Sequence, residues 1–330
     1  MSRIILAPME GLADNILRDC LTQVGGIDLC VTEFIRVTDQ LLPPRVFYRL
    51  CPELHSGGKT PAGVPVRIQL LGNHPQALGL NAQRALELGS PGVDLNFGCP
   101  AKTVNRSQGG AILLKDPTIV GEIVASVRQA IGPEAWLSAK MRLGYEDKSL
   151  AIDNAQAIAG AGANELVVHA RTKIEGYKPP AHWQWIARIR ENVDIPVIAN
   201  GEVWSQGDYL RCQQVSGCDD VMLGRGVVWR PDLARSIRNS SLPDYTWEDL
   251  QPLLLAFCQR VAEQVPERFQ GARIKQWLAL LGRVYPEAAA AFAQVKRLKS
   301  LPDIVACLIN SSSLHGHHVI ARCPKDSFHD

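Results

Sequence analysis

Short apolar and β-branched runs, each bounded by turn residues, recur along the first two thirds of the chain. They cover residues 4–9, 29–34, 66–71, 93–99, 137–143, 165–170, 196–201 and 220–225. Between most of them lie amphipathic segments, such as residues 75–89 and 117–132, with helical periodicity. Continuous apolar strands that alternate with helices are typical of a parallel sheet covered by helices.

The positions of polar residues distinguish a closed barrel from an open sheet. They lie in or just after the C-terminal halves of the runs: Glu10, Gln69, Asn96, Lys140, His169, Asn200 and Arg225. In a (β/α)8 barrel these strand ends converge on one mouth, where active sites are built. An open dinucleotide-binding sheet should carry a Gly-x-Gly-x-x-Gly motif after its first strand, and none is present. We predict an α/β fold with a TIM barrel over residues 1–240.

The pattern changes after Arg238, where strand signals give way to helical ones. Residues 239–245 read as a linker, and Thr246 with Asp249 forms a capping box at the start of a helix. Leu250, Leu254 and Phe257 form part of an apolar stripe on that helix. Further helices are expected at about 270–283, 286–299 and 302–310. We predict a small helical bundle domain over residues 245–310 and a disordered tail over 311–330.

Composition and charge are those of an ordinary globular protein. The 330 residues are 46% hydrophobic and 21% charged, and the net charge of +2 does not by itself indicate nucleic acid. Residues 268–299 nevertheless hold seven basic residues and one acidic residue, Glu287. This local excess fits contact with phosphates, and the alternative is a solvated helical face.

The nine cysteines lie at positions 20, 30, 51, 99, 212, 218, 258, 307 and 323. Their odd number, wide scatter and lack of a Cys-x-x-Cys pair argue against a disulfide framework or a zinc site. No metal site is therefore predicted. The N-terminal apolar run is too short for a signal peptide or a membrane span, so we expect a cytoplasmic protein without membrane association.

Two features of the predicted mouth suggest an anionic cofactor. Glycines follow the seventh and eighth strands, at residues 200–204 and 224–226, where barrels commonly bind phosphate, and Arg225 lies beside them. Lys140 points from the fifth strand, and a buried ammonium requires a polar or anionic partner. A reduced flavin would supply that partner, with His169 as a further donor. The alternative is a structural ion pair between Lys140 and Glu10 or another carboxylate that points into the barrel.

Linked motifs along nearly the whole chain resemble those of the tRNA-dihydrouridine synthases. They are "APMEG", "QLLG", "VDLNFGCPAKTVNRSQGGAILLKDP", "KMRLG", "LVVHARTKIEGY", "PVIANGEV" and "VMLGRG". The segments "CVTEFIRVTDQLLP" and "ARIKQWL" are similar to the C subfamily. One departure is that Arg106 and Gln108 stand in a loop that is usually richer in glycine. The resemblance implies an FMN-dependent barrel enzyme that reduces the D-loop uridine at tRNA position 16 to dihydrouridine, with NADPH as reductant.

The resemblance also implies roles for individual residues. Cys99, held between Gly98 and Pro100, would be the general acid that protonates C5 of the uracil ring after hydride reaches C6. FMN would contact Pro8, Met9, Glu10, Gln69, Lys140, His169, Asn200, Gly201, Glu202, Gly224 and Arg225. The uracil edge would meet Asn96, Arg142 and Tyr177. The tRNA backbone would meet Arg36, Arg273, Lys275 and Lys296.

We expect tRNA to be the only partner. The protein itself is expected to be a monomer that needs no obligate protein partner. Two other functions remain open. One is a flavin barrel that acts on a small pyrimidine, such as a dihydropyrimidine or dihydroorotate oxidoreductase, which gives no reason for a basic helical domain. The other is a flavin-free RNA-binding barrel that has lost its chemistry.

Overall fold

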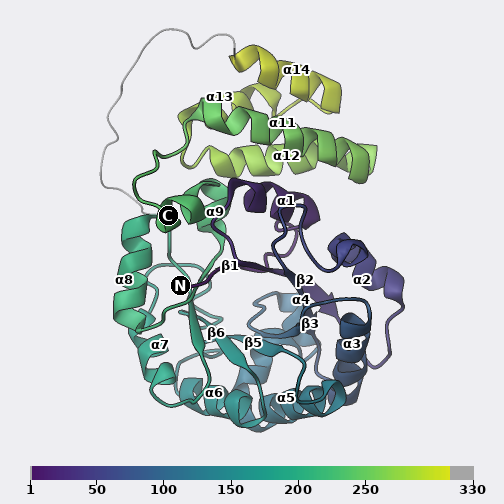
Figure 1. Cartoon of the computed structure of the whole chain (residues 1–330), viewed down its shortest axis with the longest axis vertical. Helices are drawn as coiled ribbons and strands as arrows, with labels where there is room; N and C mark the ends of the chain where they lie inside the picture. Colours follow the sequence, from purple (N-terminus) through teal and green to yellow (C-terminus); the bar gives the residue numbers. More distant parts are fainter. Residues whose placement is uncertain (1, 313–330) are drawn as a thin grey trace. The chain divides into compact units, whose positions relative to one another are not determined.

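A closed barrel of parallel strands forms the larger part of the molecule. The computed structural model describes residues 2–312. The strands join in chain order and close between the last and the first, which confirms the predicted TIM barrel (Figure 1). They are β1 (Ile4–Leu6), β2 (Leu29–Arg36), β3 (Val66–Leu71), β4 (Val93–Phe97), β5 (Leu137–Arg142), β6 (Glu165–His169), β7 (Val197–Asn200) and β8 (Val221–Leu223).

Two features of the strand pairing shape the ring: the register where β8 closes on β1, and one irregularity between β2 and β3. Ile4 pairs with Val221 where β1 meets β8. The pairing of β2 with β3 shifts between Val31 and Phe34, a β-bulge that the apolar pattern does not reveal. Within the bulge, the Thr32 hydroxyl accepts a hydrogen bond from the backbone N–H of Gln69 at 3.1 Å. A side chain thus satisfies a backbone donor at the irregularity.

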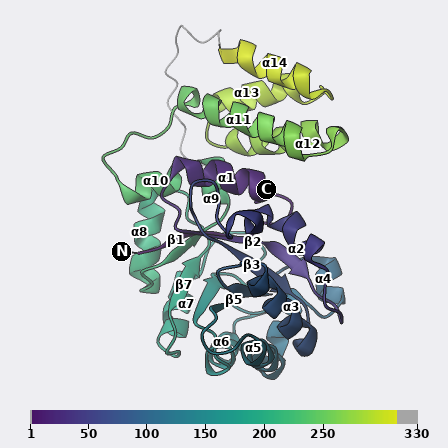
Figure 2. The ribbon, with the colours of Figure 1, turned by 45° about the vertical axis from the view of Figure 1, so that its right-hand side comes forward.

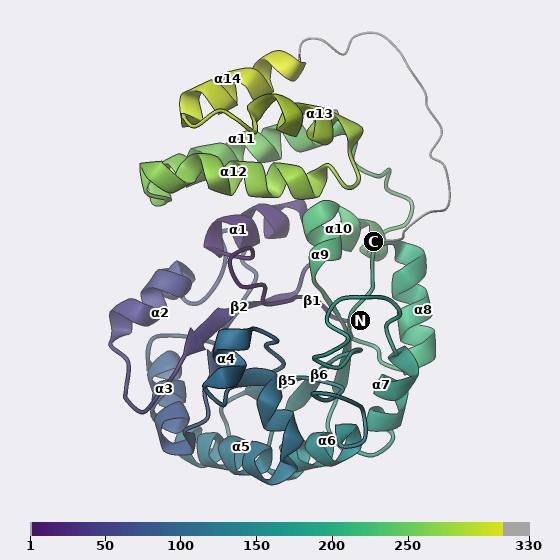
Figure 3. The same cartoon turned by 180° about the vertical axis from the view of Figure 1, so that it is seen from behind.

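Helices surround the ring of strands. They are α1 (Asn15–Val24), α2 (Pro44–Leu50), the 3-10 helix η1 (Pro52–Ser56), α3 (Pro75–Glu87), α4 (Lys102–Arg106), the 3-10 helix η2 (Gly110–Lys115), α5 (Pro117–Ile131), α6 (Ala151–Gly160), α7 (Trp183–Arg190), α8 (Gln206–Ser216), α9 (Arg225–Trp229) and α10 (Leu233–Arg238). From two further directions, α3, α5, α6 and α7 remain outside the strands (Figures 2 and 3). Local sequence explains the helix starts: the side chains of Asp14, Asp116 and Ser205 cap α1, α5 and α8.

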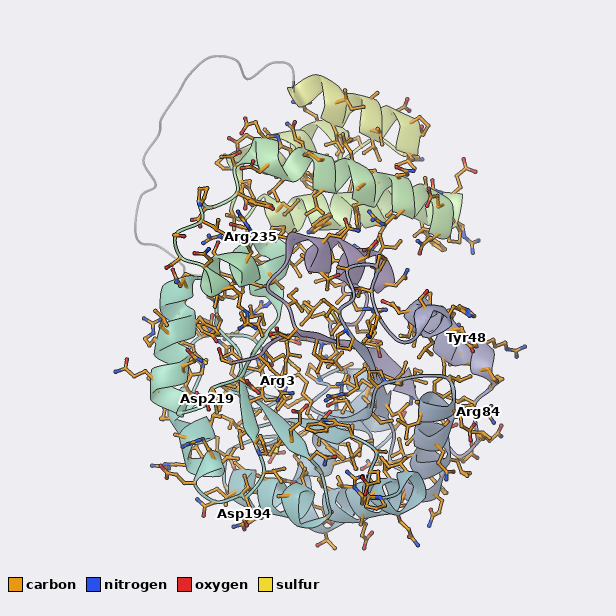
Figure 4. The ribbon with its side chains drawn as sticks, in the orientation of Figure 1. Arg3, Tyr48, Arg84, Asp194, Asp219 and Arg235 are labelled. Carbon is orange, nitrogen blue, oxygen red and sulfur yellow. The ribbon has the colours of Figure 1, made fainter. Side chains whose placement is uncertain are left out.

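The interior of the barrel is filled by side chains, as the sticks inside the ring in Figure 4 show. An apolar cluster includes Ile5, Val31 and Met222. A second part of the interior is polar and charged. The Arg67 guanidinium lies 2.5 Å from the Glu165 carboxylate, and the Arg3 guanidinium binds the other oxygen of Glu165 at 2.7 Å. These paired charges satisfy one another inside the sheet.

A second compact unit begins at Tyr245, after a first that ends at Asp244. It consists of α11 (Trp247–Gln264), α12 (Glu267–Leu281), α13 (Pro286–Val295) and α14 (Leu301–Ser312). The predicted capping box of Thr246 and Asp249 is present. Phe257 of α11 and Trp277 of α12 pack edge to face with ring centroids 4.6 Å apart. These large rings hold α11 against α12.

The helices of this unit differ at their ends from those expected: the one expected over 270–283 runs from Glu267 to Leu281, and the one expected from 302 begins at Leu301. The helix expected over 286–299 ends at Val295, because the chain turns there and the Lys275 ammonium donates to the Leu298 carbonyl at 2.9 Å. The last helix continues to Ser312, and the rest of the tail expected over 311–330 lies outside the described residues. Among residues 2–312, no helix is both long and apolar enough to cross a membrane.

Candidate active site

A cavity of about 660 Å³ opens at the carboxyl ends of the barrel strands. Its volume lies within the usual range for sites that bind cofactors and small molecules. Every residue that the sequence predicted for catalysis, cofactor binding or uracil recognition lines it: Pro8, Met9, Glu10, Gln69, Asn96, Cys99, Lys140, Arg142, His169, Tyr177, Asn200, Gly201, Glu202, Gly224 and Arg225. The closed sheet therefore brings residues far apart in the sequence to one site.

Lys140 lies in this cavity without the carboxylate partner that the alternative interpretation required. Its ammonium donates to Asn200 Oδ1 at 3.1 Å, and Asn200 in turn donates to the Met222 carbonyl at 2.8 Å. Burial and the nearby Arg142 lower the pKa of Lys140 to about 8. Within the described part of the chain Lys140 forms no ion pair with Glu10 or another carboxylate, although the more distant charge of Asp94 raises its pKa somewhat. A buried ammonium in this state would be stabilised by an incoming anion.

His169, on the neighbouring strand, has an unused hydrogen-bonding atom. Its ring is buried, and Nδ1 has no partner. Burial, with the positive charges of Arg142 and Lys140, holds the pKa of His169 well below its usual value, so the ring is neutral. A buried polar atom without a partner is costly, which indicates that a ligand supplies the missing hydrogen bond.

The glycine sites after β7 and β8 carry a cationic cluster. The Arg225 guanidinium lies 4.8 Å from the ring centre of Tyr177 and 5.1 Å from that of Trp204. Glu202 adopts a positive φ of 61°, and its carboxylate forms an ion pair with Arg171. Burial and the charge of Arg225 lower the pKa of Arg171 to about 10. Such mutual repulsion between guanidinium groups favours a bound phosphate.

Arg171 and Trp204 were not predicted from the sequence, although both line the cavity. Arg171 lies two residues after His169, so the period of two along a strand could have indicated that it faces the same way. Trp204 had no comparable signal, since its contact with Arg225 joins two loops.

The turn that carries Cys99 is held by hydrogen bonds at both ends. Asn96 Oδ1 accepts from the backbone N–H groups of Gly98 and Cys99, each at 2.9 Å. The Cys99 carbonyl accepts from Asn105 Nδ2 at 2.9 Å. Gly110, at a φ of 67°, approaches so closely that an added Cβ would lie 3.0 Å from Cys99 Cβ. The run of glycines after the cysteine thus makes room for this turn.

The chemical state of Cys99 follows from its surroundings. Its side chain is buried against Leu71 and Val104. Burial raises the pKa of the thiol, an effect that the backbone N–H of Ala101 opposes. The negative charge of Glu10 raises this pKa further, and the positive charge of Arg142 lowers it. The thiol is therefore protonated at neutral pH, and groups that would stabilise a thiolate lie beside it.

The residues predicted for the uracil edge are already engaged in part. Arg142 donates to the carbonyls of Gly98, Thr172 and Gly176, and its guanidinium lies 5.1 Å from the ring centre of Tyr177. Since Asn96 Oδ1 accepts two backbone N–H groups, only its amide nitrogen has hydrogen-bonding capacity left. Both side chains thus present fixed groups to the cavity.

The residues predicted to meet the tRNA backbone lie outside this cavity. Arg36 is exposed at the end of β2, beside a smaller cavity of about 210 Å³. In the second unit, Lys296 is exposed. Arg273 stacks over Phe257, and the ammonium of Lys275 is bound to main-chain carbonyls of residues 296 and 298. Lys275 therefore fixes the turn between α13 and α14.

Within residues 2–312, no group of three or more His, Cys, Asp or Glu side chains could hold a metal ion. The eight cysteines that the structure describes are free thiols.

The fold and the cavity define a (β/α)8-barrel enzyme with a cationic, flavin-compatible mouth. Residues 5–296 match the family model described as dihydrouridine synthase (Dus). The chain belongs to the dihydrouridine synthase family, a family of flavin-dependent oxidoreductases, which confirms the resemblance seen in its motifs.

Curated relatives cover nearly the whole chain. The tRNA-dihydrouridine(16) synthase of Aquipseudomonas alcaligenes is 57% identical over 299 residues, which is 89% of this chain and 95% of the relative. The protein of the same name from Shewanella oneidensis is 53% identical over 306 residues, covering 93% and 97% of the two chains. That from Escherichia coli O157:H7 is 47% identical over 307 residues, with the same coverage.

Among solved structures, morphinone reductase in complex with tetrahydroNAD is similar with a TM-score of 0.51. The match covers 73% of this chain and 88% of that chain at 13% identity. At this identity the likeness concerns the fold alone.

Proposed function

We propose that this protein reduces the uridine at tRNA position 16 to 5,6-dihydrouridine, with FMN as bound cofactor and NADPH as reductant. The name of the curated relatives supports the substrate and the position. The observation that carries the proposal is that Lys140 and Cys99 line the same cavity. A half-buried cation suited to an anionic cofactor and a protonated thiol thereby share one reaction space.

The residues of the cavity fit a flavin mononucleotide. Lys140, without a carboxylate partner, and His169, with its free Nδ1, suit the polar edge of the flavin ring. Arg225 and the glycine at 201 suit the phosphate, because the backbone there has no side chain to block a close approach. When bound and reduced, the flavin supplies a hydride to C6 of the uracil ring.

Cys99 completes the reduction by supplying a proton. As the C5=C6 double bond takes up hydride at C6, C5 gains electron density and accepts the proton of the Cys99 thiol. The S–H bond breaks and leaves a thiolate. The Ala101 N–H and the charge of Arg142 both lower the pKa of this thiol, so they stabilise the thiolate as it forms. Solvent then returns the proton.

The remaining site residues hold the pyrimidine. Asn96 offers its amide nitrogen, and Arg142, locked by three carbonyls, offers a rigid guanidinium to a uracil oxygen. Tyr177 is 53% exposed and lies at the rim, where it can stack on an extruded base. A loop uridine is less costly to unstack than a paired one, which suits a target in the D-loop.

The helical unit, predicted over residues 245–310, binds the tRNA backbone in this proposal, while residues 1–240 hold the flavin. Lys296 and Arg273 contribute positive charge there, and Arg36 contributes it from the barrel. Lys275 acts by fixing the turn that carries Lys296. The protein acts as a monomer in the cytoplasm and needs no protein partner.

Mass mapping of dihydrouridine in tRNA from cells that lack this chain tests the proposal. The deletion strain should lose dihydrouridine at position 16, and the wild-type gene should restore it. Cys99→Ala should lower the rate of reduction at least about 100-fold, the contribution expected of a general acid. Cys212→Ala, which removes a buried thiol on α8 away from the cavity, is the matched control and should restore the modification.

Two outcomes would contradict the proposal. Full activity of Cys99→Ala would remove the acid role. Turnover of a free pyrimidine by the purified protein, with unmodified tRNA left unchanged, would instead indicate a small-molecule oxidoreductase.

A further inference from the structure

A continuous chain of hydrogen bonds runs from the partly buried Asn96 at the Cys99 turn to fully buried side chains inside the barrel. Asn96 Oδ1 accepts the N–H of Cys99, and Asn96 Nδ2 donates to Gln69 Oε1 at 2.7 Å. Gln69 Nε2 then donates to Asp94 Oδ2 at 2.6 Å. The other Asp94 oxygen accepts the hydroxyl of Ser138 at 2.5 Å. These contacts connect three neighbouring strands, β3, β4 and β5.

The chemistry of the two ends fixes the direction of every link. Backbone N–H groups can only donate, so the oxygen of Asn96 must face the Cys99 turn. Its nitrogen must then face Gln69 and requires an acceptor, which is the oxygen of Gln69. The nitrogen of Gln69 must in turn face an acceptor. Asp94 Oδ2 is that acceptor and ends this chain, while its other oxygen accepts from Ser138.

A second chain of donors reaches Asp94 from the opposite side. The Arg67 guanidinium donates to Ser138 Oγ at 2.9 Å, which leaves the Ser138 proton to donate to Asp94. Asp94 is only 1% exposed and Gln69 is fully buried, so water cannot replace these bonds. Burial raises the pKa of Asp94, while the donors Ser138 and Gln69 lower it. Asp94 is therefore the point on which both chains converge.

We propose that Asp94 is a positioning residue for Cys99, acting through Gln69 and Asn96. With the acceptor in place, both amides have one orientation, and the Gly98–Cys99 turn is held by the Asn96 oxygen. Without it, Gln69 Nε2 loses its partner, so the Gln69 amide can turn away from Asn96 Nδ2, and the Asn96 side chain that accepts from the turn is held less firmly. This inference rests on the acid role proposed for Cys99.

The test compares Asp94→Leu with Asp94→Asn. Leucine removes the acceptor, and we expect kcat of the flavin-saturated enzyme for tRNA reduction to fall by about 10-fold or more. Asparagine can still accept from Gln69, while its nitrogen donates to Ser138, whose hydroxyl can turn to the Val93 carbonyl 3.5 Å away. Asp94→Asn should therefore retain kcat within about twofold.

A second readout does not depend on turnover. The rate at which iodoacetamide alkylates Cys99, followed by peptide mass spectrometry, reports how the turn is held. Cys99 is 7% exposed, so a loosened turn should expose it and raise the alkylation rate severalfold in Asp94→Leu but not in Asp94→Asn. The control is Thr32→Val, which removes another buried bond to Gln69, at its backbone N–H, without touching the amide chain.

The outcomes separate this inference from the proposed function. Wild-type kcat and alkylation in Asp94→Leu would overturn the positioning role, as would equal changes in Thr32→Val. If Asp94→Leu does not fold, Gln69→Met breaks the same hydrogen-bond chain one link nearer to Asn96. The rate at which Cys99 is alkylated in Gln69→Met then tests the positioning role: a wild-type rate would overturn it. Full activity of Cys99→Ala would defeat the acid role itself, whereas the alkylation result would still report on the turn.

Discussion

At the scale of single residues, the cavity keeps charges that the fold alone would not favour. Lys140 is buried against an asparagine oxygen, not a carboxylate, and the neighbouring Arg142 repels it. Its depressed pKa measures the cost of that arrangement. A bound anion would remove this unfavourable free energy and so would bind more tightly. The arrangement therefore lowers the stability of the ligand-free protein and raises its affinity for an anion.

The flavin-free protein should therefore become more stable when Lys140 is replaced by methionine. Lys140 has a pKa of about 8 when folded against 10.5 for the ordinary group, so below pH 8 its charged form costs at most about 3 kcal/mol. Between pH 8 and 10.5 the folded state has released this proton and the unfolded state has not, so stability of the wild type rises with pH. The advantage of Lys140→Met should shrink over that range.

Urea unfolding of both flavin-free proteins at pH 7 and at pH 10 measures this difference, and flavin titration should show weaker binding by Lys140→Met. The exposed lysine at position 59 offers a control, Lys59→Met, which should show no such trend. A wild type more stable than Lys140→Met at pH 7 would contradict the interpretation.

At the scale of elements, a buried ion pair fastens α1 to η1. Arg18 is fully buried and binds both oxygens of Glu53, at 2.8 and 2.9 Å. It also donates to the carbonyls of Ala13 and Leu50. These bonds satisfy the guanidinium at the junction of two segments that the sequence places more than thirty positions apart, between residues 18 and 53. The pair therefore specifies how α1 and η1 pack.

Replacing Glu53 with glutamine should cost about 3–5 kcal/mol of unfolding free energy, because Arg18 would remain buried without a counter-charge. The matched change at an exposed pair, Glu87→Gln, removes the partner of Arg84 and should cost less than about 1 kcal/mol. Chemical denaturation of the two variants compares them directly. Similar losses in both would show that burial does not govern the contribution of these pairs.

At the scale of the whole molecule, the near-neutral net charge conceals a local basic excess. Lys296, Arg297 and Lys299 lie together on the exposed turn after α13. Lys275 binds the carbonyls of this turn, so its own charge serves to shape the basic surface. Charge reversal at Lys275 would disturb the turn as well as the charge, which makes Lys296 the better test.

Lys296→Glu should weaken tRNA binding, because one phosphate contact is lost. The slope of log Kd against log salt concentration should decrease by about one. Filter binding at several salt concentrations measures both quantities, with flavin content as a check on the barrel. Arg211→Glu on α8 makes the same charge change at an exposed position of the barrel wall and should have a smaller effect. Equal effects of the two would remove Lys296 from the proposed interface.

The chain alone predicted much of this molecule because its signals are local. Each barrel strand is a short run of mainly apolar and β-branched residues bounded by turn residues, so all eight could be located, although the bulge in β2 could not. Parallel strands place their carboxyl ends at one mouth, so the polar residues at those ends could be assigned to one cavity. Trp204 was missed because its contact with Arg225 joins two loops, whereas Arg171 could have been inferred from its spacing of two from His169.

Sequence by itself therefore determined the barrel, the helical unit, the family and the set of residues at the mouth, since periodicity and motifs are properties of neighbouring positions. Only the tertiary structure decided how those residues are paired. In the folded protein Lys140 binds an amide oxygen and not a carboxylate, and Lys275 binds the carbonyls of a turn. A chain of hydrogen bonds connects the Cys99 turn to Asp94. Hydrogen-bond partners and burial depend on atoms brought together from distant strands, and no local pattern encodes them.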